Sequence, residues 1–390
     1  MAFSIVLYDD YTSRNHLLPL VATRPISNLR VGILTIDEKW RRLLKQQVSF
    51  HTVDYLRAKF PYKHIEGEIL LINGNVLPSA SLADELFALN FNSVIVDNEG
   101  DWIAVKISSE SIISFVENDI CRYNQVVFKE DIDRIKYPED IFLENAKQIT
   151  FDLEFCLKLN NQCYINKSVH LDNVVLDDSL GPIFIDESVQ IESAVVIKGP
   201  VALCKGSRVK SGTYIYPNVT IGPNTTVCGE INNTVIWGNS AKGHEGYLGC
   251  AVIGEGCNLG AGTTNSNLKN DWSTVKLYDY SCNDLRDTTL LKCGVIIGDQ
   301  VMLGIHTKIT TGSVIGVGAQ VAMSKFLPKF VPDFAWYTED KEESYIFARF
   351  IEMMRRKSTI KKEAFTKEDE NIFDKIYRMR ILEKNFINQP

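Results

Sequence analysis

The stretch IDESVQIESAVVIKGPVALCKGSRVKSGTYIYPNVTIGPNTTV, residues 185–227, carries an aliphatic residue at every sixth position. Eight residues in succession keep this register: Ile185, Ile191, Ile197, Leu203, Val209, Ile215, Ile221 and Val227. The register returns later in the chain at Ile253, Leu259, Ile297, Leu303, Ile309, Ile315 and Val321. Chance does not produce such a run, so this part of the chain is built from hexapeptide repeats.

A period of six fits neither an amphipathic helix nor a simple alternating strand. It is typical of a parallel β-helix, in which each hexapeptide supplies a short strand and a corner. The aliphatic side chain points into the prism, and small residues form the corners, as in IGPNTT and LGAGTT. A Greek-key barrel is the alternative, but barrels do not keep a strict six-residue phase. The repeat therefore predicts a solenoid of stacked coils.

The register is lost between Val227 and Ile253 and again from about Asn265 to Gly294. The first gap contains GHEGYLG, residues 243–249, and the second contains NSNLKNDW and YDYSCNDLRD. Repeat proteins place their insertions on one face, which is often the binding face. Both gaps are therefore candidate functional segments.

His244 lies in the first gap, flanked by glycines on either side of a short turn. One interpretation is an ordinary surface histidine in a glycine-rich loop. The other is a general base, because neutral imidazole can take a proton from an amine that attacks a thioester. The nearby polar residues Asn258, Asn265 and Asn267 could hold sugar hydroxyls or the amide groups of a cofactor.

Composition narrows the class of protein. The chain has 390 residues, a formal charge of −7 and a sequence pI near 5.5, which argues against nucleic acid as a partner. Neither a membrane-length apolar run nor a signal peptide is found in the sequence, and the nine cysteines are scattered. These features predict a cytoplasmic protein with reduced thiols and no membrane partner.

Residues before about 150 alternate between strand and helix patterns. FSIVLY, EILLING and NSVIVD are expected strands, and DEKWRRLL, TVDYLRAKF and LADELFAL are expected helices. This order predicts an α/β layer with a mainly parallel sheet. After Thr338 the spacing in FARFIEMMRR and NIFDKIYRMRIL predicts a helical tail that packs on the solenoid or on a neighbouring subunit.

The first half resembles sugar nucleotidyltransferases in LLPLVATRPISNLRVGILTIDEKW, where L-x-P-L precedes a basic residue, a proline and a hydrophobic run. The match is incomplete, because Asp9 and Asp10 stand where those enzymes have phosphate-cradling glycines. Asn75 stands where they have a magnesium-binding aspartate. The candidate phosphate ligands are Arg14, Arg24, Arg30 and Lys39, with ordinary surface ion pairs as the alternative. Mg²⁺ remains a candidate cofactor, and the metal ligands are unknown.

The second half resembles the acetyltransferase half of the bifunctional enzyme that makes UDP-N-acetylglucosamine, a hexapeptide acyltransferase. KGHEGYLG, IGEGCNLGAGT and SNL match its A-G-H-x-x-Y-L-G, I-G-x-x-x-N-x-G-A-G-T and C-N-Y segments. The resemblance implies a left-handed β-helix with His244 as the catalytic base. It further implies substrate contacts by Glu230, Tyr247 and Asn258, and acetyl-CoA contacts by Ala261, Asn267 and Leu268.

Two departures from that pattern bear on the acceptor. A sugar-phosphate lysine of the better-known enzymes aligns with Asn232, and a serine near acyl-CoA aligns with Ile305. The resemblance therefore predicts the type of reaction better than it predicts the acceptor molecule. As a whole, the chain resembles the GlmU-like family described mainly from Bacteroidetes, with its shortened N-terminal domain.

We therefore expect a reduced nucleotidyltransferase-like α/β domain at residues 1–155, a left-handed β-helix acyltransferase domain at 160–333 and a helical tail at 338–390. The expected function is N-acetyl transfer from acetyl-CoA to an amino-sugar phosphate such as glucosamine 1-phosphate, in a homotrimer. Nucleotidyl transfer to a sugar 1-phosphate is a second candidate activity of the first domain. The alternatives are a nucleotidyltransferase using UTP or dTTP whose solenoid only assembles the trimer, and a non-catalytic trimeric scaffold.

Overall fold

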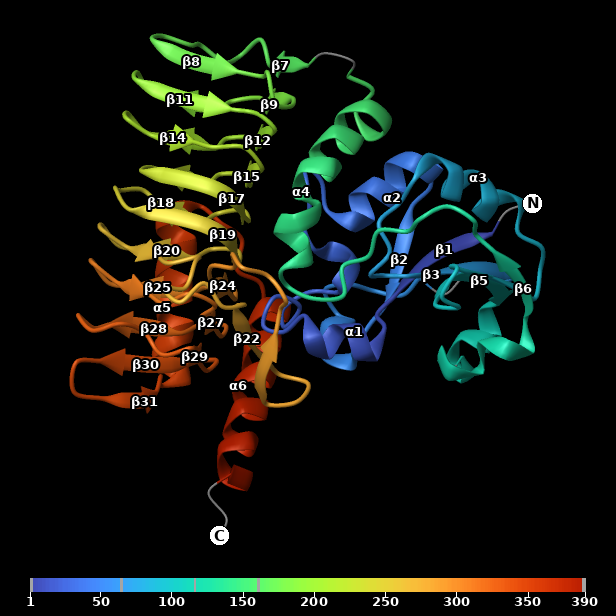
Figure 1. The fold of residues 1–390 in the computed structure, drawn as a ribbon. Coiled ribbons are helices and arrows are strands. Elements are labelled where there is room, and N and C mark those ends of the chain that lie inside the picture. Colours follow the sequence, from blue (N-terminus) through green and yellow to red (C-terminus); the bar gives the residue numbers. More distant parts are fainter. Residues whose placement is uncertain (1–2, 64–65, 116, 160–161, 388–390) are drawn as a thin grey trace.

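The computed structural model of the chain describes residues 3–63, 66–115, 117–159 and 162–387. Within them, an α/β layer comes first, a tall solenoid stands beside it, and two helices follow the solenoid (Figure 1). The expected domain limits at residues 1, 160 and 390 lie outside the described residues.

The N-terminal layer is a six-stranded sheet with the order β2-β1-β3-β5-β4-β6. Its strands are β1 (Ser4–Tyr8), β2 (Val48–His51), β3 (Glu68–Asn73), β4 (Ser93–Val96), β5 (Trp102–Ser108) and β6 (Asn124–Val127). β1 runs parallel to β2 and β3, and β4 runs parallel to β6. β5 is antiparallel to both β3 and β4, so the sheet is mixed at its centre. The three expected strands are β1, β3 and β4.

The helices of this layer are α1 (Tyr11–His16), α2 (Ile36–Leu44), α3 (Ala80–Ala88) and α4 (Asp140–Phe151), with short turns η1 (Ile26–Asn28), η2 (Asp54–Leu56), η3 (Ser109–Ser114), η4 (Glu117–Arg122) and η5 (Asp152–Cys156). The expected helices in DEKWRRLL and LADELFAL are α2 and α3. The expected helix in TVDYLRAKF is wrong, because this segment forms only the single turn η2. Pro61 disfavours helical dihedrals at Phe60, and so short a helix does not repay its nucleation.

One face of the solenoid is a nine-stranded sheet. Its strands are β10 (Gln190–Ile191), β13 (Arg208–Val209), β16 (Thr226–Val227), β18 (Ala241–Lys242), β20 (Asn258–Leu259), β25 (Met302–Leu303), β28 (Gln320–Ala322), β30 (Ala335–Thr338) and β31 (Glu342–Ser344). The strands pair in parallel until the last pair, β30 and β31, which is antiparallel.

The second face belongs to a twelve-stranded sheet. Along it lie β7 (Cys163–Ile165), β9 (Ile183–Ile185), β12 (Val201–Leu203), β15 (Val219–Ile221), β17 (Glu230–Ile236), β19 (Tyr247–Ile253), β24 (Ile296–Ile297), β27 (Val314–Ile315) and β29 (Phe330–Val331). The third face holds β8 (Val174–Asp177), β11 (Val195–Lys198), β14 (Tyr214–Ile215), β21 (Thr264–Asn265) and β26 (Lys308–Ile309). The long strands β17 and β19 turn the corner and belong to both faces, so β14 pairs with the start of β17.

The six-residue register describes the interior of this parallel β-helix. Of the aliphatic residues that define it, Ile191 is partly buried and the others are buried in one core cluster. The apparent break after Val227 is a shortened coil, because the coil from Val227 to its partner Lys242 has three residues fewer than the coil from Val209 to Val227. The strands therefore continue to stack while the sequence phase shifts.

The second break is a true insertion between two coils. It contains the antiparallel hairpin of β22 (Lys276–Asp279) and β23 (Asp284–Asp287). The hairpin points toward the N-terminal layer and lies near α1 (Figure 1). Val275 and Leu277 are buried in the core cluster of that layer.

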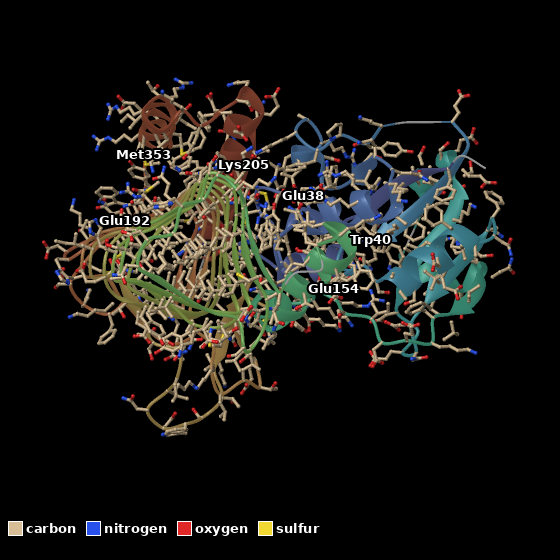
Figure 2. The ribbon with its side chains drawn as sticks, turned by 90° about the horizontal axis from the view of Figure 1, so that it is seen from above. Glu38, Trp40, Glu154, Glu192, Lys205 and Met353 are labelled. Carbon is tan, nitrogen blue, oxygen red and sulfur yellow. The ribbon has the colours of Figure 1, made fainter. Side chains whose placement is uncertain are left out.

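The α/β layer and the solenoid share one hydrophobic core. Trp40 and Ile72 of the layer belong to the same buried cluster as Val235 and Val252 of the solenoid. Seen from above, Trp40 lies in the α/β layer, while Met353 lies beside another flank of the prism (Figure 2). The solenoid is therefore covered on one flank by the α/β layer.

The expected helical tail forms α5 (Phe347–Lys361) and α6 (Lys367–Ile387). Lys357 of α5 donates to the carbonyl oxygen of Gly256 at 2.7 Å, and Phe350 packs in a cluster with Phe334 of the solenoid. Lys59 of the α/β layer pairs with Asp369 at 2.7 Å. The tail therefore packs on its own chain. In the described part of the chain, no helix is long and apolar enough to cross a bilayer.

Candidate active site

His244 lies on an exposed turn between β18 and β19, at the corner that joins the nine-stranded face to the third face. The turn is packed tightly against the next coil. Gly246 has φ +123°, and a Cβ there would lie 2.3 Å from the carbonyl oxygen of Thr263. Only glycine fits this position, so the turn has a fixed backbone and displays the imidazole to solvent.

Tyr247 is the first residue of β19 and pairs in register with Glu230 of β17. Its hydroxyl accepts a hydrogen bond from the Asn267 amide at 3.0 Å, and burial raises its pKa. A Cβ at Gly249 would lie 2.2 Å from this hydroxyl, so the ring folds back over a bare backbone. Strand pairing and one hydrogen bond thus bring Glu230, Tyr247 and Asn267 together on the third face.

Asn258 and Ala261 continue from that corner. Asn258 pairs with Ala241 on the nine-stranded face and lines a groove of about 760 Å³ between this face and α5. Ala261 lies at the corner that follows β20, and its carbonyl oxygen accepts from the backbone N–H of His306 at 2.6 Å. Leu268 forms an isolated bridge with Lys292 where the insertion begins and ends.

The expected acyltransfer residues therefore surround one edge of the prism. Glu230, Tyr247 and Asn267 lie on one side of it, and Asn258 lies on the other. His244 and Ala261 lie at the corner between them. This edge is convex within a single chain, so the residues do not enclose a shared cavity.

The insertion hairpin, which the sequence marks as a candidate functional segment, packs against the α/β layer. Asp279 bonds to Nδ1 of His16 at 2.7 Å, and Arg286 pairs with Glu139 at 2.7 Å. The Arg286 guanidinium also lies 3.9 Å above the ring centre of Tyr137. The hairpin therefore packs against the α/β layer and does not lie beside the turn of His244.

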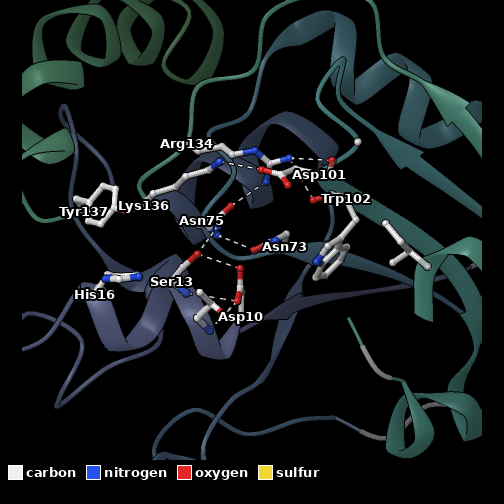
Figure 3. Close-up of a pocket in the computed structure, with 13 residues that line it drawn as sticks. Asp10, Ser13, His16, Asn73, Asn75, Asp101, Trp102, Arg134, Lys136 and Tyr137 are labelled. Atoms are coloured by element: carbon white, nitrogen blue, oxygen red, sulfur yellow. Dashed lines mark hydrogen bonds and ion pairs between the residues drawn. The ribbon is translucent and has the colours of Figure 1, made fainter. Parts of the chain in front are cut away.

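A second cavity, of about 470 Å³, opens in the α/β layer (Figure 3). Its lining includes Asp10, Ser13, His16, Asn73, Asn75, Asp101, Trp102, Arg134, Lys136 and Tyr137. The cations facing it are Arg134, which donates to Asn75 at 3.1 Å, and Lys136, which pairs with Asp101 at 2.8 Å. Neither residue could be predicted from the sequence, because both follow an irregular segment with no motif of its own.

The four expected phosphate ligands are placed elsewhere. Arg14 is buried and pairs with Asp9 at 2.8 Å, and Lys39 is fully buried against Asp152. Arg24 pairs with Asp299 at 2.6 Å and with Glu255 at 2.9 Å, across the junction with the solenoid. Arg30 donates to the backbone carbonyl of Ile33 and lies 3.8 Å from Glu38.

These four residues are therefore corrected from phosphate ligands to structural cations. Ion pairs were the alternative interpretation, but the pairs at Arg14 and Lys39 are buried and not on the surface. Long basic side chains beside acidic residues look alike in sequence whether they face solvent or a core. Whether each of the four cations faces solvent or a core is decided by the residues it contacts in the folded chain, and several of these residues are more than 100 positions away in the sequence.

Asp9 and Asp10 also have structural roles. Burial raises the pKa of Asp9, whose carboxylate accepts from Arg14 and from the Ile26 N–H at 2.8 Å. Asp10 caps α1 by accepting from the Thr12 N–H at 2.9 Å and the Ser13 hydroxyl at 2.9 Å. A carboxylate therefore already occupies the helix end that would cradle a phosphate.

The donor set around this cavity does not fit Mg²⁺. Magnesium favours carboxylate oxygens in a near-octahedral arrangement. Asp10 is used as a cap, Asp101 is paired with Lys136, and Asn75 offers only an amide. Across the described residues, no group of three or more acidic, histidine or cysteine side chains could hold a metal ion.

Comparisons with known proteins cover both halves. Residues 5–160 match the family model described as sugar nucleotidyl transferase. The bifunctional protein GlmU of Methanocaldococcus jannaschii is 26% identical over 302 residues, 67% of this chain and 72% of that protein. A bifunctional sugar-1-phosphate nucleotidylyltransferase/acetyltransferase of Sulfurisphaera tokodaii is 32% identical over 172 residues, 39% of this chain and 40% of that protein.

Among solved structures, the Francisella novicida UDP-N-acetylglucosamine acyltransferase aligns with 59% of this chain and 89% of its own. The TM-score is 0.32 and the identity is 16%. The assignment of a β-helix therefore depends on the strand pairing described above. Fold and sequence together define a protein in which a sugar nucleotidyltransferase-like domain precedes a hexapeptide β-helix. The chain is thus similar in sequence to bifunctional GlmU-type proteins over both of these parts.

Proposed function

We propose that this chain is an N-acetyltransferase that moves the acetyl group of acetyl-CoA to the amine of an amino-sugar phosphate such as glucosamine 1-phosphate. The observation that carries the proposal is the corner turn of His244, which exposes an imidazole beside the paired Tyr247 and Asn267. The name of the Sulfurisphaera tokodaii relative, which includes an acetyltransferase, supports the same activity.

In the proposed step the neutral amine nitrogen attacks the thioester carbonyl, and His244 takes the proton that this nitrogen loses as the C–N bond forms. The C–S bond then breaks, and the departing thiolate of coenzyme A takes up that proton from His244. The oxyanion formed on the way needs N–H donors. In the described residues, the N–H groups of Ala261 and Gly262 donate to no backbone carbonyl, which makes them candidates.

We further propose a homotrimer in which a neighbouring prism covers this edge. A convex edge cannot surround a substrate, and a second chain facing it would create a groove lined by His244, Ala261 and Asn267. Light scattering should therefore give three times the mass of 44.1 kDa at micromolar concentration. A monomer at that concentration would contradict the shared site.

The expected domain limits, 1–155, 160–333 and 338–390, and a cytoplasmic location remain part of this proposal. All nine cysteines are free, which suits a reducing compartment. We propose substrate contacts by Glu230, Tyr247 and Asn258 and acetyl-CoA contacts by Ala261, Asn267 and Leu268.

The test is a panel of thermal melts with acetyl-CoA, UTP, dTTP and amino-sugar phosphates, followed by release of the coenzyme A thiol with each acceptor. A ligand present at a hundredfold its Kd should stabilise the fold by about 2.7 kcal/mol. Thiol release with an amino-sugar phosphate supports the proposal. Stabilisation by UTP or dTTP alone favours the nucleotidyltransferase, and the absence of any shift favours the scaffold.

A second activity, nucleotidyl transfer to a sugar 1-phosphate, is favoured by the 470 Å³ cavity in the α/β layer. We propose that this activity is weak, because the Asp10 carboxylate caps α1 and the cations facing the cavity are already paired. Pyrophosphate release with UTP or dTTP and sugar 1-phosphates should stay below about 1 per second, under the usual range of enzymes. Faster magnesium-dependent turnover would contradict this interpretation of the cavity.

A further inference from the structure

The interior of the β-helix contains one lysine in a column of aliphatic residues. Lys242 pairs in register with Val227, which pairs with Val209 one coil earlier. The next positions of the column, Leu259 and Leu303, are aliphatic again. Lys242 is 1% exposed and is one of the largest fully buried side chains of the protein.

The ammonium group of Lys242 bonds to backbone carbonyls of the turn that carries His244. It donates to the carbonyl oxygen of Glu245 at 2.7 Å and also to that of His244. In the part of the chain that the structure describes, no carboxylate lies within 4.0 Å of this ammonium group, and burial lowers its pKa. Its partners in the prism are therefore the neutral dipoles of the turn.

This arrangement costs stability where an aliphatic residue would add it. Removing an ammonium from water costs several kcal/mol, and carbonyl dipoles return only part of that cost. The neighbouring coils show that an aliphatic side chain fits the same column. The presence of a lysine at this position is therefore explained by its hydrogen bonds to the turn and not by its packing in the prism.

The two bonds from Lys242 bear on the direction in which the carbonyl groups of the turn point. Carbonyl groups directed into an apolar prism would be unsatisfied without it, at about 1–3 kcal/mol each. With it, the carbonyls of His244 and Glu245 are held inward. The close approach of Gly246 to the Thr263 carbonyl holds the other end of the turn.

We propose that Lys242 is a positioning residue for His244: it anchors the turn from inside the prism, so that the imidazole is held at the corner in one orientation. The proposal rests on the proposed acetyl transfer, in which His244 is the base. Lys242 touches no substrate, because it is enclosed in the prism.

The test is Lys242→Met, which keeps the length of the side chain and removes its donors. Without the ammonium, the two carbonyls turn toward water, which the surface position of the turn allows, so the melting temperature should stay within about 3 °C of wild type. We expect kcat to fall at least tenfold while KM for both substrates changes less than threefold. Amide hydrogen exchange of residues 243–247 should accelerate at least tenfold.

Leu303→Met is the matched control, because it makes a volume-conserving change in the same column two coils away. It should leave kcat, the melting temperature and the exchange of the turn unchanged. Unchanged kcat and unchanged exchange in Lys242→Met would overturn the proposal. A fall in kcat that follows a large fall in melting temperature would overturn it too, in favour of a purely structural role.

The exchange measurement separates this proposal from the proposed function. If His244→Ala retains acetyl transfer, the assignment of the base fails. Faster exchange at the turn in Lys242→Met would then still show that the lysine anchors it, whereas unchanged exchange would reject the anchor as well.

Discussion

Lys39 and His244 are polar residues in opposite surroundings: Lys39 is fully buried against Asp152, and His244 is exposed on a turn of the solenoid. His244 could be found because a turn that breaks a regular repeat is visible in the sequence. Lys39 could not be assigned, because its position in α2 does not reveal that Asp152, 113 residues later, lies against it in the core. Its role is a matter of long-range packing.

The buried ion pair of Lys39 and Asp152 predicts that removing the lysine lowers the free energy of unfolding. Lys39→Met leaves the Asp152 carboxylate buried without its cation, which costs about 3–5 kcal/mol of unfolding free energy. Arg42→Met, at an exposed position of the same helix, should cost less than about 0.5 kcal/mol. Urea unfolding measures both variants, and equal small losses would mean that Lys39 is not a structural cation.

Among the elements, the strands of the solenoid were the most predictable part. Their aliphatic period reflects the interior of a prism, which imposes the same requirement on every coil. The shortened coil at Lys242 and the direction of the β22–β23 hairpin were not predictable, because neither follows from the repeat. The hairpin is positioned by Glu139 and His16 of the other layer.

Strand β19 offers a test of the proposed acceptor site. In Gly249→Ala the new Cβ would lie 2.2 Å from the Tyr247 hydroxyl, so the ring must move away from Asn267. If the Tyr247 ring contacts the amino sugar, KM for the acceptor should rise at least tenfold, and KM for acetyl-CoA should change less than threefold. Steady-state kinetics decide this, with a thermal melt to show that the variant is folded. Equal changes in both KM values would contradict the assignment.

Across the whole molecule, the α/β layer and the solenoid are joined by a buried core and by a charged cluster. Arg24 lies 4.7 Å above the ring centre of Trp237 and pairs with Glu255 and Asp299. The sequence predicts two kinds of architecture but not this junction, because the partners of Arg24 are more than 200 residues away. A residue that resembled a phosphate ligand is therefore part of the link between the layers.

This junction makes the stability of the protein dependent on pH. Burial alone would raise the pKa of Glu255, but the Arg24 guanidinium outweighs it and holds that pKa below its ordinary value near 4.5. A carboxylate whose pKa is lowered by folding stabilises the fold above its unfolded pKa, and this stabilisation is lost as the pH falls through the folded pKa. The melting temperature should therefore decrease as the pH is lowered below about 4.5. In Glu255→Gln the melting temperature should decrease less steeply over the same pH range. An identical pH dependence in the variant would exclude the Arg24–Glu255 pair as a source.

The proposed acetyl transfer depends on His244 as its base. Its most direct measurement is the rate of coenzyme A release with glucosamine 1-phosphate for wild type, His244→Ala and the control His170→Ala, whose histidine is exposed near the first coil. Loss of a general base costs about a hundredfold to ten-thousandfold, so His244→Ala should lose at least a hundredfold in kcat with its mass and melting temperature unchanged, while His170→Ala keeps full activity. A kcat within threefold of wild type in folded His244→Ala would show that His244 is not the base.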